Sequence, residues 1–258
     1  MKKLFLFLLL AVFASVTFAA GFDWPASTEL IRALQNNQST LDPAVTARVQ
    51  QFIDAAAPEN DSEKRRVIAL RVMARTQTAG ADMSWTAQKK YVDDQIAAAQ
   101  LEKELTGAAY LDLLYIWWYR GWDKEIYALM QTQPGAELWA NAGHVCDKME
   151  KYAEAYEYYK ASGIFPDRAV NIAATRLNDP AKAFEAAKLI LIRTYHAPCV
   201  GAVIERTVSG LVGNAAIPAD EMKAFLQNAN RKYSSMLIRD EAAWKPIITT
   251  IRTMLETY

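Results

Sequence analysis

Histidine and cysteine, two of the side chains that bind zinc in proteins, occur close together at two places in the sequence. His144 stands two residues before Cys146, and His196 stands three residues before Cys199. Neither spacing matches a zinc knuckle. In addition, positions i and i+2 of a helix, such as His144 and Cys146, point in different directions. His144 and Cys146 also lack the third, orienting group that an activated thiol needs. We therefore predict no metal, no cofactor and no cysteine-based catalytic site.

Carboxylates near an aromatic cluster are the other residues that could do chemistry. Asp112, Asp123 and Glu125 lie in such a region, and facing carboxylate pairs hydrolyse glycosidic bonds. The sequence has no G-x-S-x-G or H-E-x-x-H motif, no Walker loop and no dinucleotide-binding glycine pattern. We therefore predict a non-catalytic protein. The alternative is an all-α carbohydrate-active enzyme or carbohydrate-binding protein that uses residues 110–159.

Aromatic residues are concentrated in the same region. Of the 19 Trp and Tyr residues, 12 lie between Tyr110 and Tyr159, and LDLLYIWWYRGW contains five of them. Most aromatic residues at helical spacing belong to a core, but the rings in this segment span most faces of a helix. One or two of them should therefore face solvent and bind a peptide, a partner helix or a sugar. The candidates are Tyr115, Trp118, Tyr119 and Trp122.

The first residues are typical of a secretory signal peptide. Lys2 and Lys3 precede the apolar run 4–12, and Thr17 and Ala19 supply the small residues before a cleavage site. We expect cleavage after Ala19, export to the bacterial periplasm or beyond, and no stable membrane insertion afterwards. The whole sequence has 29 basic and 29 acidic residues, a balance that argues against nucleic-acid binding.

The rest of the sequence indicates an all-α protein, because apolar residues recur at helical spacing and β-branched alternation is almost absent. Asn60 and Glu63 have the spacing of a capping box and mark the start of one helix. We read residues 20–258 as a single domain of antiparallel helix hairpins. The predicted helices cover 27–35, 43–56, 62–76, 85–105, 108–119, 123–132, 137–149, 152–162, 167–177, 181–194, 199–212, 219–228 and 240–257.

Residues 137–166 show the clearest pattern. Trp139, Ala142, Gly143 and Cys146 fall on one face of a helix, and a second helix repeats this spacing with Tyr152, Ala155, Tyr159 and Ser162. Gly143 and Ala155 should let the two backbones approach closely. The segment resembles one unit of the tetratricopeptide repeat, W-x2-L-G-x2-Y…A-x3-F…P, which has a period of about 34 residues.

This resemblance implies a right-handed α-solenoid of stacked hairpins that binds a protein or peptide partner. Residues 121–127 align with 151–157, and 179–184 follow after a further 28 residues, so the best repeats cover about 108–194. In that family the inner face of the first helix contacts the ligand. The resemblance assigns this role to Glu137, Ala140, His144, Asp147 and Lys148.

The only two cysteines, Cys146 and Cys199, would be expected to pair in an oxidising compartment. In a regular stack, with helices about 8–10 Å apart, they would lie about two repeats from each other. A disulfide needs Cα atoms within about 7 Å. Whether they pair is open from the sequence, and pairing would require the stack to curl or break after Thr194.

Overall fold

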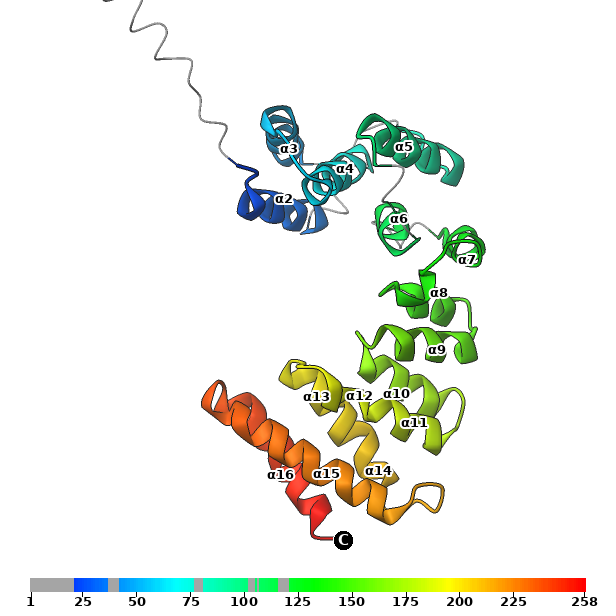
Figure 1. Cartoon of the computed structure of the whole chain (residues 1–258), viewed down its shortest axis with the longest axis vertical. Coiled ribbons are helices and arrows are strands. Elements are labelled where there is room, and N and C mark those ends of the chain that lie inside the picture. Colours follow the sequence, from blue (N-terminus) through cyan, green and yellow to red (C-terminus); the bar gives the residue numbers. More distant parts are fainter. Residues whose placement is uncertain (1–20, 37–41, 77–80, 102–104, 106, 116–120) are drawn as a thin grey trace, which may run out of the picture. The chain divides into compact units, whose positions relative to one another are not determined.

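The computed structural model in Figure 1 describes residues 21–36, 42–76, 81–101, 105, 107–115 and 121–258. Every regular element in the described residues is a helix, and no strand occurs among these residues. The all-α prediction is therefore confirmed. The predicted signal peptide, Trp118 and Tyr119 lie outside the described residues. Within the described part, no helix combines the length and the apolar character needed to cross a membrane.

The chain divides into two compact units. The first contains residues 1–105 and 113–118, and the second contains residues 106–112 and 119–258. Helix α6, Gly107–Leu114, includes residues of both.

The first unit has four helices among its described residues: α2 (Trp24–Asn36), α3 (Pro43–Ala55), α4 (Asp61–Thr76) and α5 (Trp85–Ala98). Helices α2, α3 and α4 pack against one another, and α5 packs on α4 (Figure 1). Their shared core includes Leu30, Leu34, Val49 and Leu70. The sequence places such residues every three or four positions, so each helix buries one face.

The ends of these helices follow from local side chains. The predicted cap of α4 is present, because the backbone N–H of Glu63 donates to Asn60 Oδ1 at 3.1 Å and Glu63 in turn accepts from the N–H of Glu59. Helix α5 ends at Ala98 instead of the predicted 105. Gln100 adopts a positive φ of 58°, and the N–H of Leu101 bonds back to the carbonyl of Ile96, which closes the helix without a glycine.

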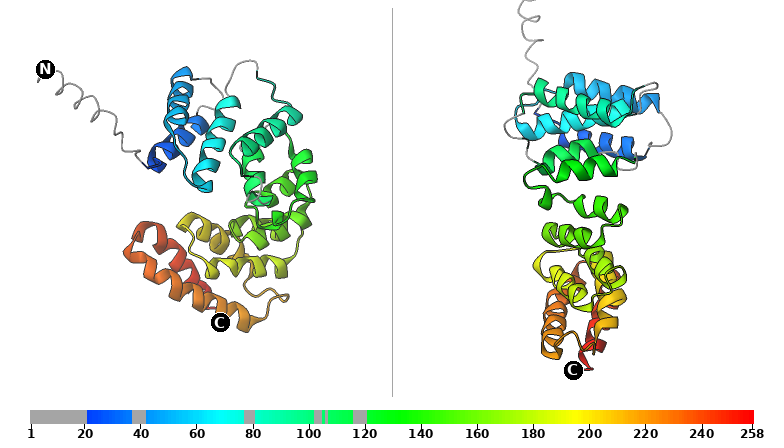
Figure 2. Two further views of the ribbon diagram at one scale, coloured as in Figure 1. Left: turned by 45° about the horizontal axis from the view of Figure 1, so that its top comes forward. Right: turned by 90° about the vertical axis from the view of Figure 1, so that its right-hand side faces the viewer.

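The second unit is a succession of short helices. Each helix from α7 to α11 packs against the next one; α10 also packs on α13, α13 on α16, and α16 lies beside α15 (Figure 2). Their bounds are α7 Asp123–Met130, η2 Ala136–Leu138, α8 Ala142–Lys148, α9 Tyr152–Ser162, α10 Pro166–Thr175, α11 Pro180–Ala187, α12 Leu189–Ile192, α13 Ala197–Val203, η3 Ile204–Val208, α14 Ser209–Leu211, α15 Ala219–Ser234, η4 Ser235–Ile238 and α16 Glu241–Leu255.

Helices α8 and α9 approach each other closely. Gly143 is buried, and a Cβ added to it would lie 2.6 Å from ring atoms of Tyr159. Because Gly143 is near the start of α8 and Tyr159 near the end of α9, the two helices are antiparallel. Ala155 is also fully buried. The expectation that Gly143 and Ala155 face the core is therefore confirmed.

The predicted helix over 137–149 is wrong in its first part. Gly135 has a φ of 76°, a single 3-10 turn follows at η2, and Trp139 is extended with φ −70° and ψ 125°. Helix α8 begins only at Ala142. Trp139 is nonetheless buried, and its indole N–H donates to Asp112 at 2.7 Å. The extended backbone at Trp139 ends the 3-10 turn and separates it from α8.

Three further predicted bounds differ from the structure. The predicted helix over 181–194 is divided into α11 and α12, and the one over 199–212 contains the π-helical turn η3. Helix α15 continues to Ser234, beyond the predicted 228, because buried Ala229 and Tyr233 extend its apolar face. These differences arise from packing between helices, which the periodicity of one segment does not reveal.

Candidate functional site: the polar face of α8

Helix α8 has one buried side and one polar side. Val145 and Cys146 are buried with Gly143, whereas His144, Asp147 and Lys148 are partly or fully accessible. These three residues occupy positions i, i+3 and i+4, so they share one face of the helix. We call Asp123, His144, Asp147, Lys148 and Arg168 the polar face, since the charges of the other four act on His144.

An ion pair joins the polar face of α8 to α7. Lys148 Nζ lies 3.2 and 3.0 Å from the two carboxylate oxygens of Asp123. The side chains are 31% and 17% exposed, so solvent screens this pair less than a fully exposed one. Asp123 is in the first turn of α7 and Lys148 in the last turn of α8, where the helix dipoles favour their charges.

The electrostatic environment of His144 disfavours its protonation. Burial is the main reason that the pKa of His144 is lowered, and the positive charges of Lys148 and Arg168 lower it further. The carboxylates of Asp147 and Asp123 act in the opposite direction. At neutral pH the imidazole is therefore neutral and serves as both a donor and an acceptor. Helix α10 contributes to this environment through Arg168, a residue that the sequence did not indicate.

The other predicted site residues that the structure describes lie outside helix α8. Glu137 is exposed on η2, and Ala140 is half-buried in the turn before α8, so neither shares a helix with His144. Trp122 is half-buried at the start of α7, and Tyr115 is buried. The inner-face prediction is thus wrong in grouping Glu137 and Ala140 on one helix with His144. The ring of Tyr115 is not accessible to a partner.

Two aliphatic side chains near α8 are exposed, and sequence reasoning missed both. Leu138 on η2 is 62% exposed, and Ile164, between α9 and α10, is 42% exposed. Because α8 and α9 are antiparallel, the residues that precede α8 and those that follow α9 lie at the same end of the pair. We call Leu138 and Ile164 the apolar end. The sequence does not indicate that either side chain is exposed, because an aliphatic residue beside a helix terminus usually belongs to the core.

The three carboxylates of the enzyme hypothesis have different surroundings. Asp112 accepts the Trp139 hydrogen bond, and loss of hydration against the surrounding protein raises the pKa of its carboxyl although part of the residue is exposed. Asp123 is paired with Lys148, and Glu125 is exposed on α7. The raised pKa of Asp112 suits a general acid.

Both cysteines are free thiols in the structure. Cys146 is buried in α8, where desolvation raises its pKa to about 12. Cys199, on α13, donates to Asp167 Oδ1 at 3.6 Å, and burial raises its pKa to about 11. No cluster of three or more His, Cys, Asp or Glu residues that could hold a metal occurs within the described ranges.

Comparison with known proteins provides no family for this chain. No protein-family model matches it, and neither does any curated protein or solved structure.

Proposed function

We propose that the protein is an exported, non-catalytic helical-repeat protein that binds a protein or peptide partner through the polar face and the apolar end. The observation that carries this proposal is the arrangement of charged groups from α7, α8 and α10 around His144. Helix α8, which carries His144, Asp147 and Lys148, is packed tightly against α9 by the contact between Gly143 and Tyr159. Polar groups on a rigid base set specificity, and exposed aliphatic side chains supply apolar contact.

For the architecture, we propose a right-handed, tetratricopeptide-like stack of hairpins over about 108–194. Neighbour-to-neighbour packing from α7 to α11 supports this proposal. Hydrogen bonds also link each hairpin to the next: Tyr127 OH donates to Glu154 at 2.6 Å, and Tyr156 OH donates to the carbonyl of Lys182 at 3.2 Å. Such contacts between neighbours are what stabilise repeat arrays.

The binding proposal can be tested by affinity capture with the mature protein from the envelope fraction of the source cells. The double variant His144→Ala/Asp147→Ala removes two groups of the polar face and leaves the Lys148–Asp123 pair in place. Lys245→Ala is the control, because this lysine is exposed on α16 and pairs with nearby Glu241. We expect one stoichiometric partner with the wild type and the control, and at least tenfold less with the double variant at unchanged melting temperature. Equal recovery with all three would refute the proposal.

Export is tested separately. Expression of the full chain in a bacterium, followed by cell fractionation and N-terminal sequencing, should give a periplasmic or secreted protein that begins at Ala20. A protein that keeps Met1 and stays in the cytoplasm would contradict export without affecting the binding face.

The raised pKa of Asp112 favours one alternative, an all-α carbohydrate-active enzyme. Because a raised pKa favours the protonated form, a carboxyl of this kind beside an indole ring is suited to act as the general acid at a glycosidic oxygen. This alternative predicts that the wild type hydrolyses a polysaccharide and that Asp112→Asn does not. Absence of hydrolysis by the wild type over a panel of polysaccharides, or equal hydrolysis by the variant, would eliminate it.

A further inference from the structure

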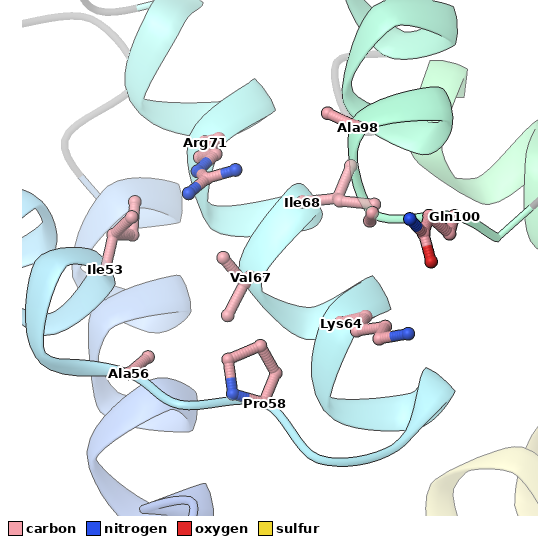
Figure 3. Close-up of a pocket in the computed structure, with 10 residues that line it drawn as sticks. Ile53, Ala56, Pro58, Lys64, Val67, Ile68, Arg71, Ala98 and Gln100 are labelled. Atoms are coloured by element: carbon pink, nitrogen blue, oxygen red, sulfur yellow. The ribbon is translucent and has the colours of Figure 1, made fainter.

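The first unit contains a cavity of about 330 Å³ over α4 (Figure 3). Its wall is formed by α4, by the segment from the end of α3 to Pro58, and by the end of α5. Pockets for small molecules usually have about 300–1,000 Å³. This cavity is at the lower limit, so it suits one short chain or one side chain.

Most of the residues that line the cavity are apolar. Ile53 comes from α3, while Val67 and Ile68 come from α4, and all three are buried in the structure. Pro58 and Ala98 complete the apolar walls, with Val67 directed toward Pro58 in Figure 3. An aliphatic group placed against these side chains would be removed from water, which favours its binding.

Among the described residues that line the cavity, the two charged ones, Lys64 and Arg71, are both cationic. They are seven positions apart on α4 and therefore lie on the same side of the helix. Lys64 Nζ lies 3.7 Å from Asp61, an ion pair with both side chains about 30% exposed, which a ligand can displace at small cost.

Arg71 has greater capacity to bind an anion. Its Nη1 donates to the side-chain oxygen of Gln95 at 3.0 Å, and this acceptor is a neutral amide, so the bond itself does not compensate the charge of the guanidinium. A guanidinium carries five N–H donors, of which this bond uses one. Its planar geometry matches the two oxygens of a carboxylate.

We propose that this cavity binds an aliphatic carboxylate, with the chain against Ile53, Val67 and Ile68 and the carboxylate at Arg71 and Lys64. The two cations disfavour aliphatic amines. A short fatty acid and the C-terminus of a peptide with an apolar last residue share this chemistry. The inference goes beyond the proposed partner binding and does not depend on it.

Isothermal titration of the full mature chain with sodium octanoate, below its micelle-forming concentration, tests the proposal. Octanol and octylamine have the same chain with no charge or the opposite charge, and both should bind at least tenfold more weakly. N-acetyl-leucylleucine and its C-terminal amide form the peptide arm. Binding of octanoate alone identifies a free acid as the ligand, and binding of both carboxylates but not of the amide extends the site to peptide C-termini. Octanol binding as tightly as octanoate, or no binding of either carboxylate, would overturn the proposal.

Variants locate the binding. Arg71→Gln should weaken octanoate binding about tenfold or more, because it removes a charged hydrogen-bonding partner. Ala98→Leu should weaken it similarly by filling the cavity from an exposed position at the end of α5 without changing any charge. Lys90→Gln is the control, since it removes one positive charge from a side chain that is 74% exposed and does not line the cavity. Equal weakening by Lys90→Gln, or unchanged binding by Ala98→Leu, would refute this location.

Discussion

Replacing Gly143 by alanine tests the contact that fixes α8 against α9. In most helices this change is favourable, because alanine is better than glycine by about 1 kcal/mol in helix propensity. Here the new Cβ would lie 2.6 Å from Cγ and Cδ1 of Tyr159, whereas carbon atoms normally approach to about 3.5 Å. The overlap is therefore about 0.9 Å.

The Tyr159 ring has little room to move away. It is 1% exposed, and the ring of Phe165 packs against it edge to face with centroids 6.1 Å apart. Overpacking of this kind costs about 1–3 kcal/mol, and two helices held apart lose further contacts. After subtraction of the gain in propensity, we expect Gly143→Ala to lower the free energy of unfolding by up to about 2 kcal/mol. The melting temperature should then fall by up to about 8 °C.

Urea denaturation followed by circular dichroism measures this change, and the chain provides a matched control. Gly210 is exposed in α14, and a Cβ added to it would meet nothing within 4 Å. Gly210→Ala should therefore leave the protein as stable or stabilise it by up to about 1 kcal/mol. In a double-mutant cycle, Tyr159→Leu should recover part of the loss caused by Gly143→Ala. Equal stabilisation by both glycine substitutions would show that α8 and α9 are not in close contact.

Three further predictions concern single side chains. Burial raises the pKa of Cys146 to about 12 and that of Cys199 to about 11, so a thiol reagent at pH about 8 should modify both cysteines slowly in the native protein. In denaturant both thiols should react at once, whereas a disulfide between them would leave no thiol to react. The lowered pKa of His144 means that the unfolded chain takes up the proton first as pH falls below about 6.5. The free energy of unfolding should therefore fall from pH about 7 to 5, and His144→Gln should reduce this slope; an unchanged slope would contradict the assignment. Lys232 Nζ donates to the carbonyls of Ile190, Leu191 and Arg193 at the end of α12. Lys232→Met should therefore lower the free energy of unfolding, measured by urea denaturation, by about 2 kcal/mol. A decrease below about 0.5 kcal/mol would contradict this capping role.

Helix α9 shows which features of the fold can be predicted from the sequence. Its bounds agree with the prediction, because Ala155, Tyr159 and Ser162 form a buried face and Gly163, with a φ of 59°, ends the helix. Local pattern and local termination point to the same structure there. At α8 they conflict, because the spacing of Trp139 continues the helical pattern while its backbone is extended. Periodicity records which side chains are buried and does not record whether the backbone between them is helical.

The candidate site was predictable to the same extent. His144, Asp147 and Lys148 share a face because of their spacing, which can be read from one segment. Arg168 comes from another helix and contributes only after α10 packs beside α9. The cavity in the first unit also depends on packing between helices, because the ends of α3 and α5 supply apolar residues beside Lys64 and Arg71. Sites of this kind are formed by tertiary packing, for which a single sequence has no periodic signal.

The turn between α8 and α9 links this packing to the polar face. Glu150 occupies it with a φ of 58°, a conformation that costs a residue other than glycine about 1–2 kcal/mol. The N–H of Lys151 donates to the carbonyl of Cys146 at 2.9 Å and so satisfies a group at the end of α8. Because this closure is tight, α9 turns back directly and places Tyr159 against Gly143. The buried side of α8 is thereby fixed, and His144, Asp147 and Lys148 are held on the opposite side.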